Sequence, residues 1–190
     1  MRFPRRIPLV AVLVAAAGLG QGACNSESLL PEAGYLNVVD TVTLYALRGT
    51  EVTLPSGYDV ANRTTSRTDV ATFDFAFDIN TAGQGVALPA GALRLAREPG
   101  SAPVTTPFDS IIEAPESGYL DSLPVPIAPG TVFVVRSRFL LAGCEFAGAV
   151  PRYGKFRVME IDPALRRLKL QALVNRNCGY RGLQPGNPPN

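Results

Sequence analysis

The segment 70–80 (VATFDFAFDIN) constrains the fold most, because apolar residues alternate along it with polar or small ones. One face carries Ala71, Phe73, Phe75, Phe77 and Ile79, and the other carries Thr72, Asp74, Ala76, Asp78 and Asn80. A period of two with one apolar face is typical of a half-buried strand in an antiparallel sheet. We therefore expect the phenylalanines to pack in a core and both aspartates to lie on a solvated face. The alternative is that the phenylalanine stripe lines a ligand pocket.

Further strand patterns occur on both sides of this segment. Segment 41–47 is followed by the turn-like Arg48-Gly49-Thr50 and then by 51–55, which predicts a hairpin or a turn-linked pair. Segment 130–143 contains another strand. The strongest hairpin pattern joins 155–161 to 167–175, with Asp162-Pro163 starting the turn.

The high content of proline and glycine agrees with a chain of short strands separated by turns. The chain has 17 prolines and 18 glycines, and beyond the first two dozen residues no segment keeps a helical period over three turns. We predict an all-β fold, an antiparallel two-sheet sandwich-like single domain. The expected division is a signal segment at 1–23, a tether at 24–34, the β-rich domain at 35–182 and a flexible tail at 183–190.

The first residues resemble a bacterial export signal. Arg2, Arg5 and Arg6 form a positive region, and the apolar stretch 7–19 follows it. About 20 residues are needed to span a bilayer as a helix, so this stretch is too short, whereas it matches the apolar core of a signal peptide.

Cys24 follows the small residues Gly22 and Ala23, an arrangement that resembles the bacterial lipobox. In that motif the cysteine is acylated and becomes the new N-terminus. The motif usually has leucine or another aliphatic residue where this chain has Gln21. We expect lipid attachment at Cys24 and a place in the bacterial cell envelope, at the outer membrane. The alternative is ordinary cleavage after Gly20, which leaves Cys24 free.

The chain has three cysteines, Cys24, Cys144 and Cys178. If Cys24 carries lipid, the other two can pair in an oxidising compartment without leaving an odd thiol. Their spacing differs from the CxxC of redox-active pairs, so we expect a structural Cys144–Cys178 disulfide. Without residues 1–23, 15 basic residues face 16 acidic ones, a net charge of −1. A near-neutral domain offers no electrostatic footprint for nucleic acid.

The sequence provides little for catalysis. It has no histidine, which excludes Ser–His–Asp and Cys–His arrangements. Asp74 and Asp78 are four residues apart on a strand, about 13 Å, which is too far for the carboxylate pair of a glycosidase. We therefore expect that the protein is not an enzyme.

The segment 108–122 (FDSIIEAPESGYLDS) gathers four acidic residues. Clustered carboxylates suit a calcium ion, but the sequence favours a polar loop without metal. The residues concerned are Asp109, Glu113, Glu116 and Asp121.

Three segments together resemble the HmuY-like family of bacterial surface lipoproteins: 108–122, then 129–138 (PGTVFVVRSR), then 152–162 (RYGKFRVMEID). The resemblance covers about 70–178 in the same order. The matching residues are Phe108, Asp109, Glu113, Ala114, Pro115, Gly118, Tyr119, Gly130, Val132, Phe133, Val134, Val135, Arg136, Ser137, Tyr153, Gly154 and Lys155.

The resemblance implies an all-β protein tethered to the outer membrane that binds haem and passes it to an uptake receptor. Family members hold the iron with two histidines or two methionines, whereas this chain has no histidine and, beyond the signal segment, only Met159. Haem could instead be held by a tyrosine phenolate or by apolar stacking alone. The candidate ligand-binding residues are Tyr119, Tyr153 and Met159. The alternative places both tyrosines in the core or at an edge, and makes Met159 an apolar filler within its strand.

Two functions are therefore expected as alternatives. One is a lipoprotein that binds haem or another apolar ligand for uptake. The other is a non-catalytic structural or adhesive envelope module that binds a protein or glycan partner. An exposed groove lined by phenylalanines near Tyr119 or Tyr153 would favour the first, and a filled core with shallow surface clefts would favour the second.

Overall fold

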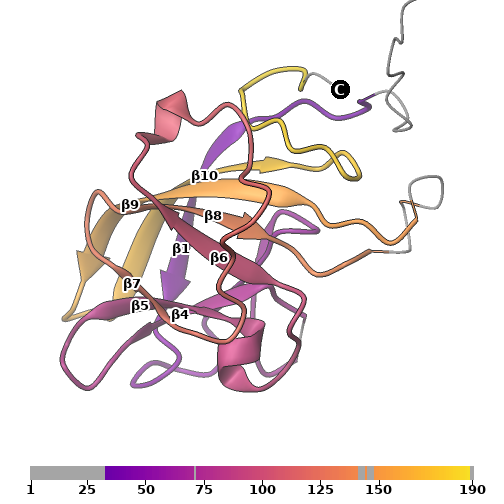
Figure 1. Cartoon of the computed structure of the whole chain (residues 1–190). Coiled ribbons are helices and arrows are strands. Elements are labelled where there is room, and N and C mark those ends of the chain that lie inside the picture. The colour runs from indigo at the N-terminus through magenta and orange to yellow at the C-terminus, as the bar shows by residue number, and fades with distance from the viewer. Residues whose placement is uncertain (1–32, 71, 141–143, 145–147, 189–190) are drawn as a thin grey trace, which may run out of the picture.

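The computed structural model describes residues 33–70, 72–140, 144 and 148–188. The signal segment, Cys24 and almost all of the tether lie outside the described residues. Two five-stranded antiparallel sheets stack on each other (Figure 1), which confirms the predicted all-β sandwich. The described part contains two short 3-10 turns, η1 (Ala90–Leu93) and η2 (Phe108–Ser110), and no α-helix. It also contains no helix with the length and apolar character to cross a membrane.

The first sheet has the strand order β1-β10-β9-β8-β6, and the second has the order β3-β2-β4-β5-β7. The first comprises β1 (Val39–Tyr45), β10 (Arg167–Asn175), β9 (Tyr153–Asp162), β8 (Val132–Arg136) and β6 (Gly100–Val104). The second comprises β3 (Thr64–Ser66), β2 (Gly57–Asp59), β4 (Phe75–Ile79), β5 (Gly85–Pro89) and β7 (Val125–Ile127).

The predicted hairpin of β9 and β10 is confirmed. The side chain of Asp162 accepts hydrogen bonds from the amides of Ala164 (3.0 Å) and Leu165 (2.9 Å), which fixes the turn. A β-bulge interrupts the ladder, because Lys169 pairs with Glu160 but Leu170 pairs with Val158.

The residue left unpaired in that bulge is Met159, and it is 48% exposed. The expectation that Met159 fills an apolar strand is therefore wrong. The extra residue lets both Val158 and Ile161 face the core, so the methionine between them turns outward.

The two sheets enclose one main core. Phe75 and Phe77 of β4 pack there with Phe133 of β8 and Phe156 of β9, which confirms a core role for these stripe residues. The ring of Phe75 meets those of Phe133 and Phe156 edge to face, a favourable arrangement for aromatic pairs. Phe73 departs from the predicted stripe, because it packs with Ala76 and Ala90 in a separate cluster.

The expectation that Asp74 and Asp78 lie on a solvated face is wrong, because both are buried. β4 is the central strand of its sheet, and both of its faces are covered. Each carboxylate is paired with arginine from distant segments: Arg138 reaches Asp74, and Arg48 and Arg166 reach Asp78. The strand is therefore fully buried rather than half-buried.

The predicted strand at 51–55 is also wrong, since these residues form a turn after β1. The Leu54 amide donates to the Glu51 carbonyl (3.0 Å) and the Tyr45 amide donates to the Pro55 carbonyl (2.9 Å). Local turn bonds thus take the place of a sheet ladder. The strand expected within 130–143 is confirmed as β8, although it ends at Arg136.

The segment after residue 182 does not form the expected flexible tail. Leu183 is fully buried, and its amide donates to the carbonyl of Ile112 at 2.8 Å. Asn37 and Gly186 exchange backbone hydrogen bonds of 2.7 and 2.9 Å. The segment covers the outer face of the first sheet, where Leu183 joins Val134 and Leu173 in a second apolar cluster. Residues 189 and 190 lie outside the described part.

Candidate functional site

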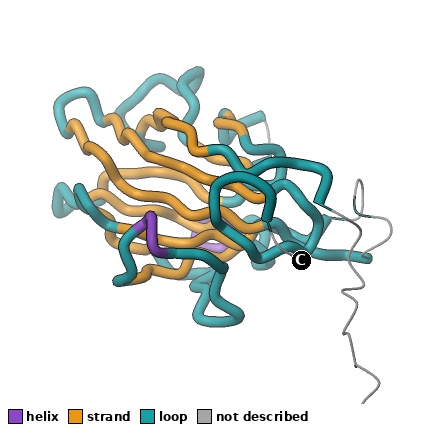
Figure 2. The backbone as a smooth tube through the Cα atoms, turned by 90° about the horizontal axis from the view of Figure 1, so that it is seen from above, coloured by secondary structure: helices purple, strands orange, loops and turns teal. Residues whose placement is uncertain are grey.

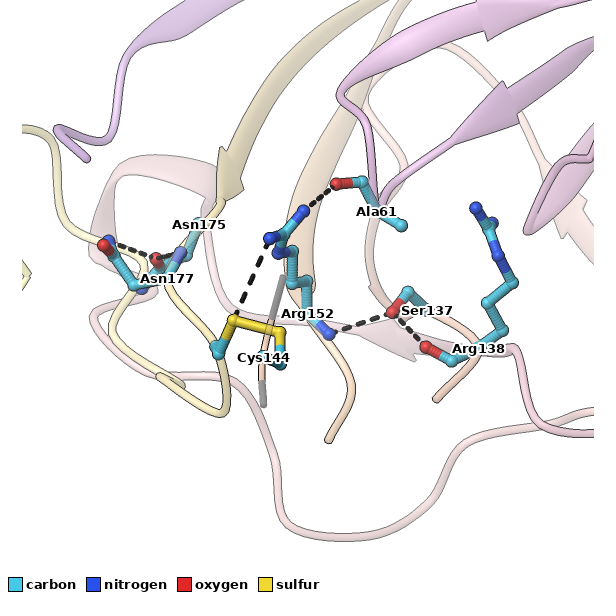
Figure 3. Close-up of a disulfide and its surroundings, with 8 residues drawn as sticks. Ala61, Ser137, Arg138, Cys144, Arg152, Asn175 and Asn177 are labelled. Carbon is cyan, nitrogen blue, oxygen red and sulfur yellow. Dashed lines mark hydrogen bonds between the residues drawn. A yellow bond between two sulfur atoms is a disulfide. The ribbon is translucent and has the colours of Figure 1, made fainter. Parts of the chain in front are cut away.

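The predicted disulfide between Cys144 and Cys178 is confirmed, with their Cα atoms 5.6 Å apart. It joins the loop between β8 and β9 to the segment after β10. A structural disulfide indicates an extracytoplasmic domain. Figure 3 shows that Arg152 lies between the disulfide and the second sheet: its guanidinium donates to the Ala61 carbonyl and lies 3.9 Å from the Cys178 sulfur.

The same loop is held by a buried ionic cluster. The guanidinium of Arg138 binds Asp59 at 3.1 Å and Asp74 at 3.1 Å, and the Arg138 amide donates to Asp74 at 2.9 Å. Asp74 also accepts the amide of Val60 at 2.7 Å. Burial raises the pKa of the Asp74 carboxyl, while the Arg138 and Val60 contacts oppose that rise. Sequence reasoning missed this cluster, because Arg138 lies 64 residues from Asp74 in the chain.

Tyr119 and Tyr153, the two tyrosines singled out in the sequence, are brought together. Their ring centroids are 6.2 Å apart, and the guanidinium of Arg136 lies 5.0 Å from the ring centroid of Tyr119. The Tyr119 hydroxyl donates to the Pro115 carbonyl at 2.9 Å. Burial raises the pKa of both phenols, although Arg136 and Arg181 oppose the rise. Met159 does not join them, since it lies six residues further along β9, about 20 Å away.

These residues do not fit an iron site. A phenolate ligand loses its proton when it binds a metal, and burial, which raises the pKa of both tyrosines, opposes that loss. The Tyr119 hydroxyl is engaged with the Pro115 carbonyl, and Met159 is too distant to complete a pair with either tyrosine. The contacts instead make the two rings part of the packing between the 108–122 loop and the first sheet.

The four acidic residues of that loop do not form one cluster. Glu113 and Glu116 both face Arg181, at 3.5 and 2.8 Å, and Asp109 lies 3.8 Å from Arg157. Among the residues that the structure describes, no group of three or more acidic, cysteine or histidine side chains could hold a metal ion.

Lys155 is a further residue that sequence reasoning missed as a structural group. It is buried, and its Nζ donates to the carbonyls of Phe108 (2.8 Å) and Ile111 (3.0 Å). The ammonium also lies 4.6 Å from the centroid of the Phe108 ring. Burial lowers the pKa of Lys155. The lysine thus fastens the 108–111 turn to the outer face of the first sheet.

Beside this turn runs a groove of about 850 Å³. Val104 and Val132 contribute apolar surface, Thr106 and Thr131 contribute hydroxyls, and Arg157 contributes the charge. Arg157 lies 5.5 Å from the centroid of the Phe108 ring. We call this surface the β6–β8 groove; its lining residues are Pro103, Val104, Thr105, Thr106, Pro107, Phe108, Gly130, Thr131, Val132 and Arg157.

The tyrosines predict a pH-dependent stability. The pKa values of Tyr58, Tyr119 and Tyr153 are raised by burial above their ordinary value. Their contribution to the free energy of unfolding is therefore fully present below about pH 10 and is lost as pH rises above that value. In a pH titration we expect part of the phenolate absorbance to appear only above about pH 10, together with unfolding. Tyr119→Phe and Tyr153→Phe should each reduce the absorbance that appears in this range. A titration curve identical to that of the urea-unfolded chain would contradict the prediction.

Comparisons of the chain with protein-family models, with curated proteins and with solved structures found no match.

Proposed function

We propose that the protein is a lipid-anchored, non-catalytic module of the bacterial envelope that binds a protein partner through the β6–β8 groove. The observation that carries this proposal is that six phenylalanines are used for packing: Phe73, Phe75, Phe77, Phe108, Phe133 and Phe156 are all buried. Phe139 is 46% exposed, but it does not line the groove. Among the described residues, no aromatic ring is left exposed in the groove to hold an apolar cofactor.

Two observations support a location in the cell envelope. The N-terminal sequence resembles an export signal followed by a lipobox, and the Cys144–Cys178 disulfide belongs to an oxidising compartment. A domain held at a membrane by a short tether is suited to presenting a surface to a neighbouring molecule.

The composition of the groove favours a protein partner. It combines apolar side chains, threonine hydroxyls and one arginine, and the interiors of protein interfaces are likewise poor in charge and enriched in arginine. The groove has a volume of about 850 Å³, and its lining residues Thr105, Thr106 and Pro107 are exposed. Lys155 holds the wall of the groove in place, so little conformational entropy would be lost on binding.

A photo-crosslinking amino acid at Thr106 tests the proposal in intact cells. We expect a discrete crosslinked product there and none at Thr53, an exposed threonine in the turn after β1. With the identified partner purified, Thr106→Arg should weaken binding at least tenfold, about 1.4 kcal/mol, whereas Thr53→Arg should leave it unchanged. Equal products at both positions, or a Thr106→Arg protein that binds normally, would overturn the groove as the site.

A glycan-binding function and a haem-binding function would each give a different experimental result. A crosslink at Thr106 to polysaccharide would make the partner a glycan. A haem titration should give no saturable Soret shift, because the tyrosines and Met159 do not fit an iron site. A shift at one equivalent that disappears in Tyr119→Phe or Tyr153→Phe would instead support the haem-carrier function of the HmuY-like family.

A further inference from the structure

One end of the sandwich gathers the segments that lead to the tether. β1 begins there at Val39, which pairs with Leu173 near the end of β10. β9 begins there at Tyr153, opposite Asn175 of β10 and Arg136 of β8. Figures 1 and 2 show the C-terminal segment and several loops at this same end. We call it the terminal end; the opposite end carries the turn between β9 and β10.

The chain is firmly held where it enters the domain. The side chain of Asn177 accepts the amide of Tyr35 at 2.9 Å and donates to the carbonyl of Tyr35 at 2.8 Å. Asn177 is itself bonded to Asn175 of β10 and precedes the disulfide residue Cys178. Two residues after Tyr35, Asn37 pairs with Gly186. The segment 35–38 therefore has a fixed orientation on the domain.

This fixed segment exposes a large amount of apolar surface. Tyr35 is 49% exposed, Leu36 is 63% exposed and Val38 is 45% exposed. The guanidinium of Arg176 lies 4.4 Å from the centroid of the Tyr35 ring, and it has no ion pair with a carboxylate of the described residues. We call Tyr35, Leu36, Val38 and Arg176 the exit patch.

A second arginine, Arg152, lies beside the exit patch, with its guanidinium turned toward the Ala61 carbonyl. Arg152 lies close enough to Tyr35 and Arg176 for both to affect its pKa, which burial lowers. Arg152 is likewise without a carboxylate partner in the part of the chain that the structure covers. Apolar and aromatic side chains next to such arginines suit the boundary between the headgroups and acyl chains of an anionic bilayer.

We propose that the exit patch lies against the anionic phospholipid bilayer that holds Cys24. This inference rests on the lipid anchor in the proposed function. Tyr35 follows Cys24 by eleven residues, a stretch that spans at most about 40 Å, so the terminal end always stays near the bilayer. The β6–β8 groove includes Gly130 and Thr131 at the start of β8, the end of that strand remote from Arg136. Docking by the exit patch would thus leave the groove facing away from the membrane.

The chain contains no tryptophan, so a single introduced tryptophan can report contact with lipid. Leu36→Trp places the reporter in the exit patch. Leu165→Trp is the matched control, because Leu165 is 58% exposed and lies in the turn at the opposite end. The full lipidated protein is reconstituted in phosphatidylethanolamine–phosphatidylglycerol vesicles whose acyl chains are brominated. We expect strong quenching of tryptophan emission in the Leu36→Trp protein and none in the Leu165→Trp protein.

A second pair of variants tests the charge. In the Leu36→Trp background, Arg176→Gln should reduce the quenching severalfold, whereas Lys169→Gln, which removes an exposed cation on β10, should not change it. Val38→Trp provides an independent reporter in the exit patch if the Leu36→Trp protein folds poorly. Replacing phosphatidylglycerol with phosphatidylcholine should have the same effect as Arg176→Gln.

Intact mass and vesicle flotation separate the possible failures. An acylated protein that floats with vesicles while both exit-patch reporters remain unquenched would overturn the docking and leave the anchored module intact. A protein without acyl mass that does not float would overturn the anchor and the docking together. A blue shift of the emission of the Leu36→Trp protein without bromine quenching would show that a protein or a second copy covers the patch, which also overturns the proposal.

Discussion

Asp74→Ala is expected to lower the free energy of unfolding by about 3–5 kcal/mol, the usual cost of removing one partner of a buried ion pair. The carboxylate has no exposed surface and accepts the Val60 amide, the Arg138 amide and the Arg138 guanidinium. Its removal leaves three backbone amides, those of Val60, Ala61 and Arg138, without this acceptor and leaves the Arg138 guanidinium with Asp59 alone. Urea denaturation measures the change directly.

The matched control for this substitution is Asp69→Ala. Asp69 also pairs with an arginine, Arg67, but the pair lies at the surface, where water replaces the lost contact. We expect no measurable change in the urea midpoint for Asp69→Ala. If the Asp74 variant were as stable as this control, the ionic cluster would not hold the sandwich together.

Replacing both Cys144 and Cys178 with serine should lower the free energy of unfolding by about 3–4 kcal/mol, as the chain-entropy relation gives for a loop of this size. The two cysteines are separated by 34 residues, so the bridge closes a long loop in the unfolded chain. In thermal unfolding experiments, adding reductant should lower the stability of the unsubstituted protein by the same amount. Reductant should not lower the stability of the double variant any further.

The disulfide and the ionic cluster hold the same loop, so their effects should not add. Arg138 and Cys144 both lie between β8 and β9, and Arg152 connects that loop to Ala61 (Figure 3). Once the disulfide is absent, Asp74→Ala should lower the free energy of unfolding by less than it does in the oxidised protein. Cys24→Ser is the control for loss of a cysteine as such, and it should leave the unfolding midpoint unchanged.

Strands β1, β4, β8, β9 and β10 were predictable because their signals are local, whereas β2, β3, β5, β6 and β7 were not predicted. Alternation marked β4, β9 and β10, and the Asp162-Pro163 turn marked the hairpin between the last two. The cysteine pair followed from counting under the expectation that Cys24 carries lipid, which leaves two thiols. The resemblance to an export signal and a lipobox stays a prediction, because those residues lie outside the described part.

The site depended on contacts between residues far apart in the chain. Alternation assigned Asp74 to solvent because a half-buried and a fully buried strand can share one pattern, and the carboxylate can be buried only because Arg138 compensates its charge. Lys155 is similar, since its partners at Phe108 and Ile111 lie more than 40 residues away. The bulge that turns Met159 outward depends on the register with β10.

The sequence by itself therefore determined strands β1, β4, β8, β9 and β10, the β-sandwich class and the disulfide, because each follows from neighbouring residues or from a count. The tertiary structure alone decided which charges are buried, which groove is open and where the exit patch lies. The reason is that burial and ion pairing are properties of surfaces brought together by the fold, and β-sheet pairing joins segments whose separation along the chain carries no signal.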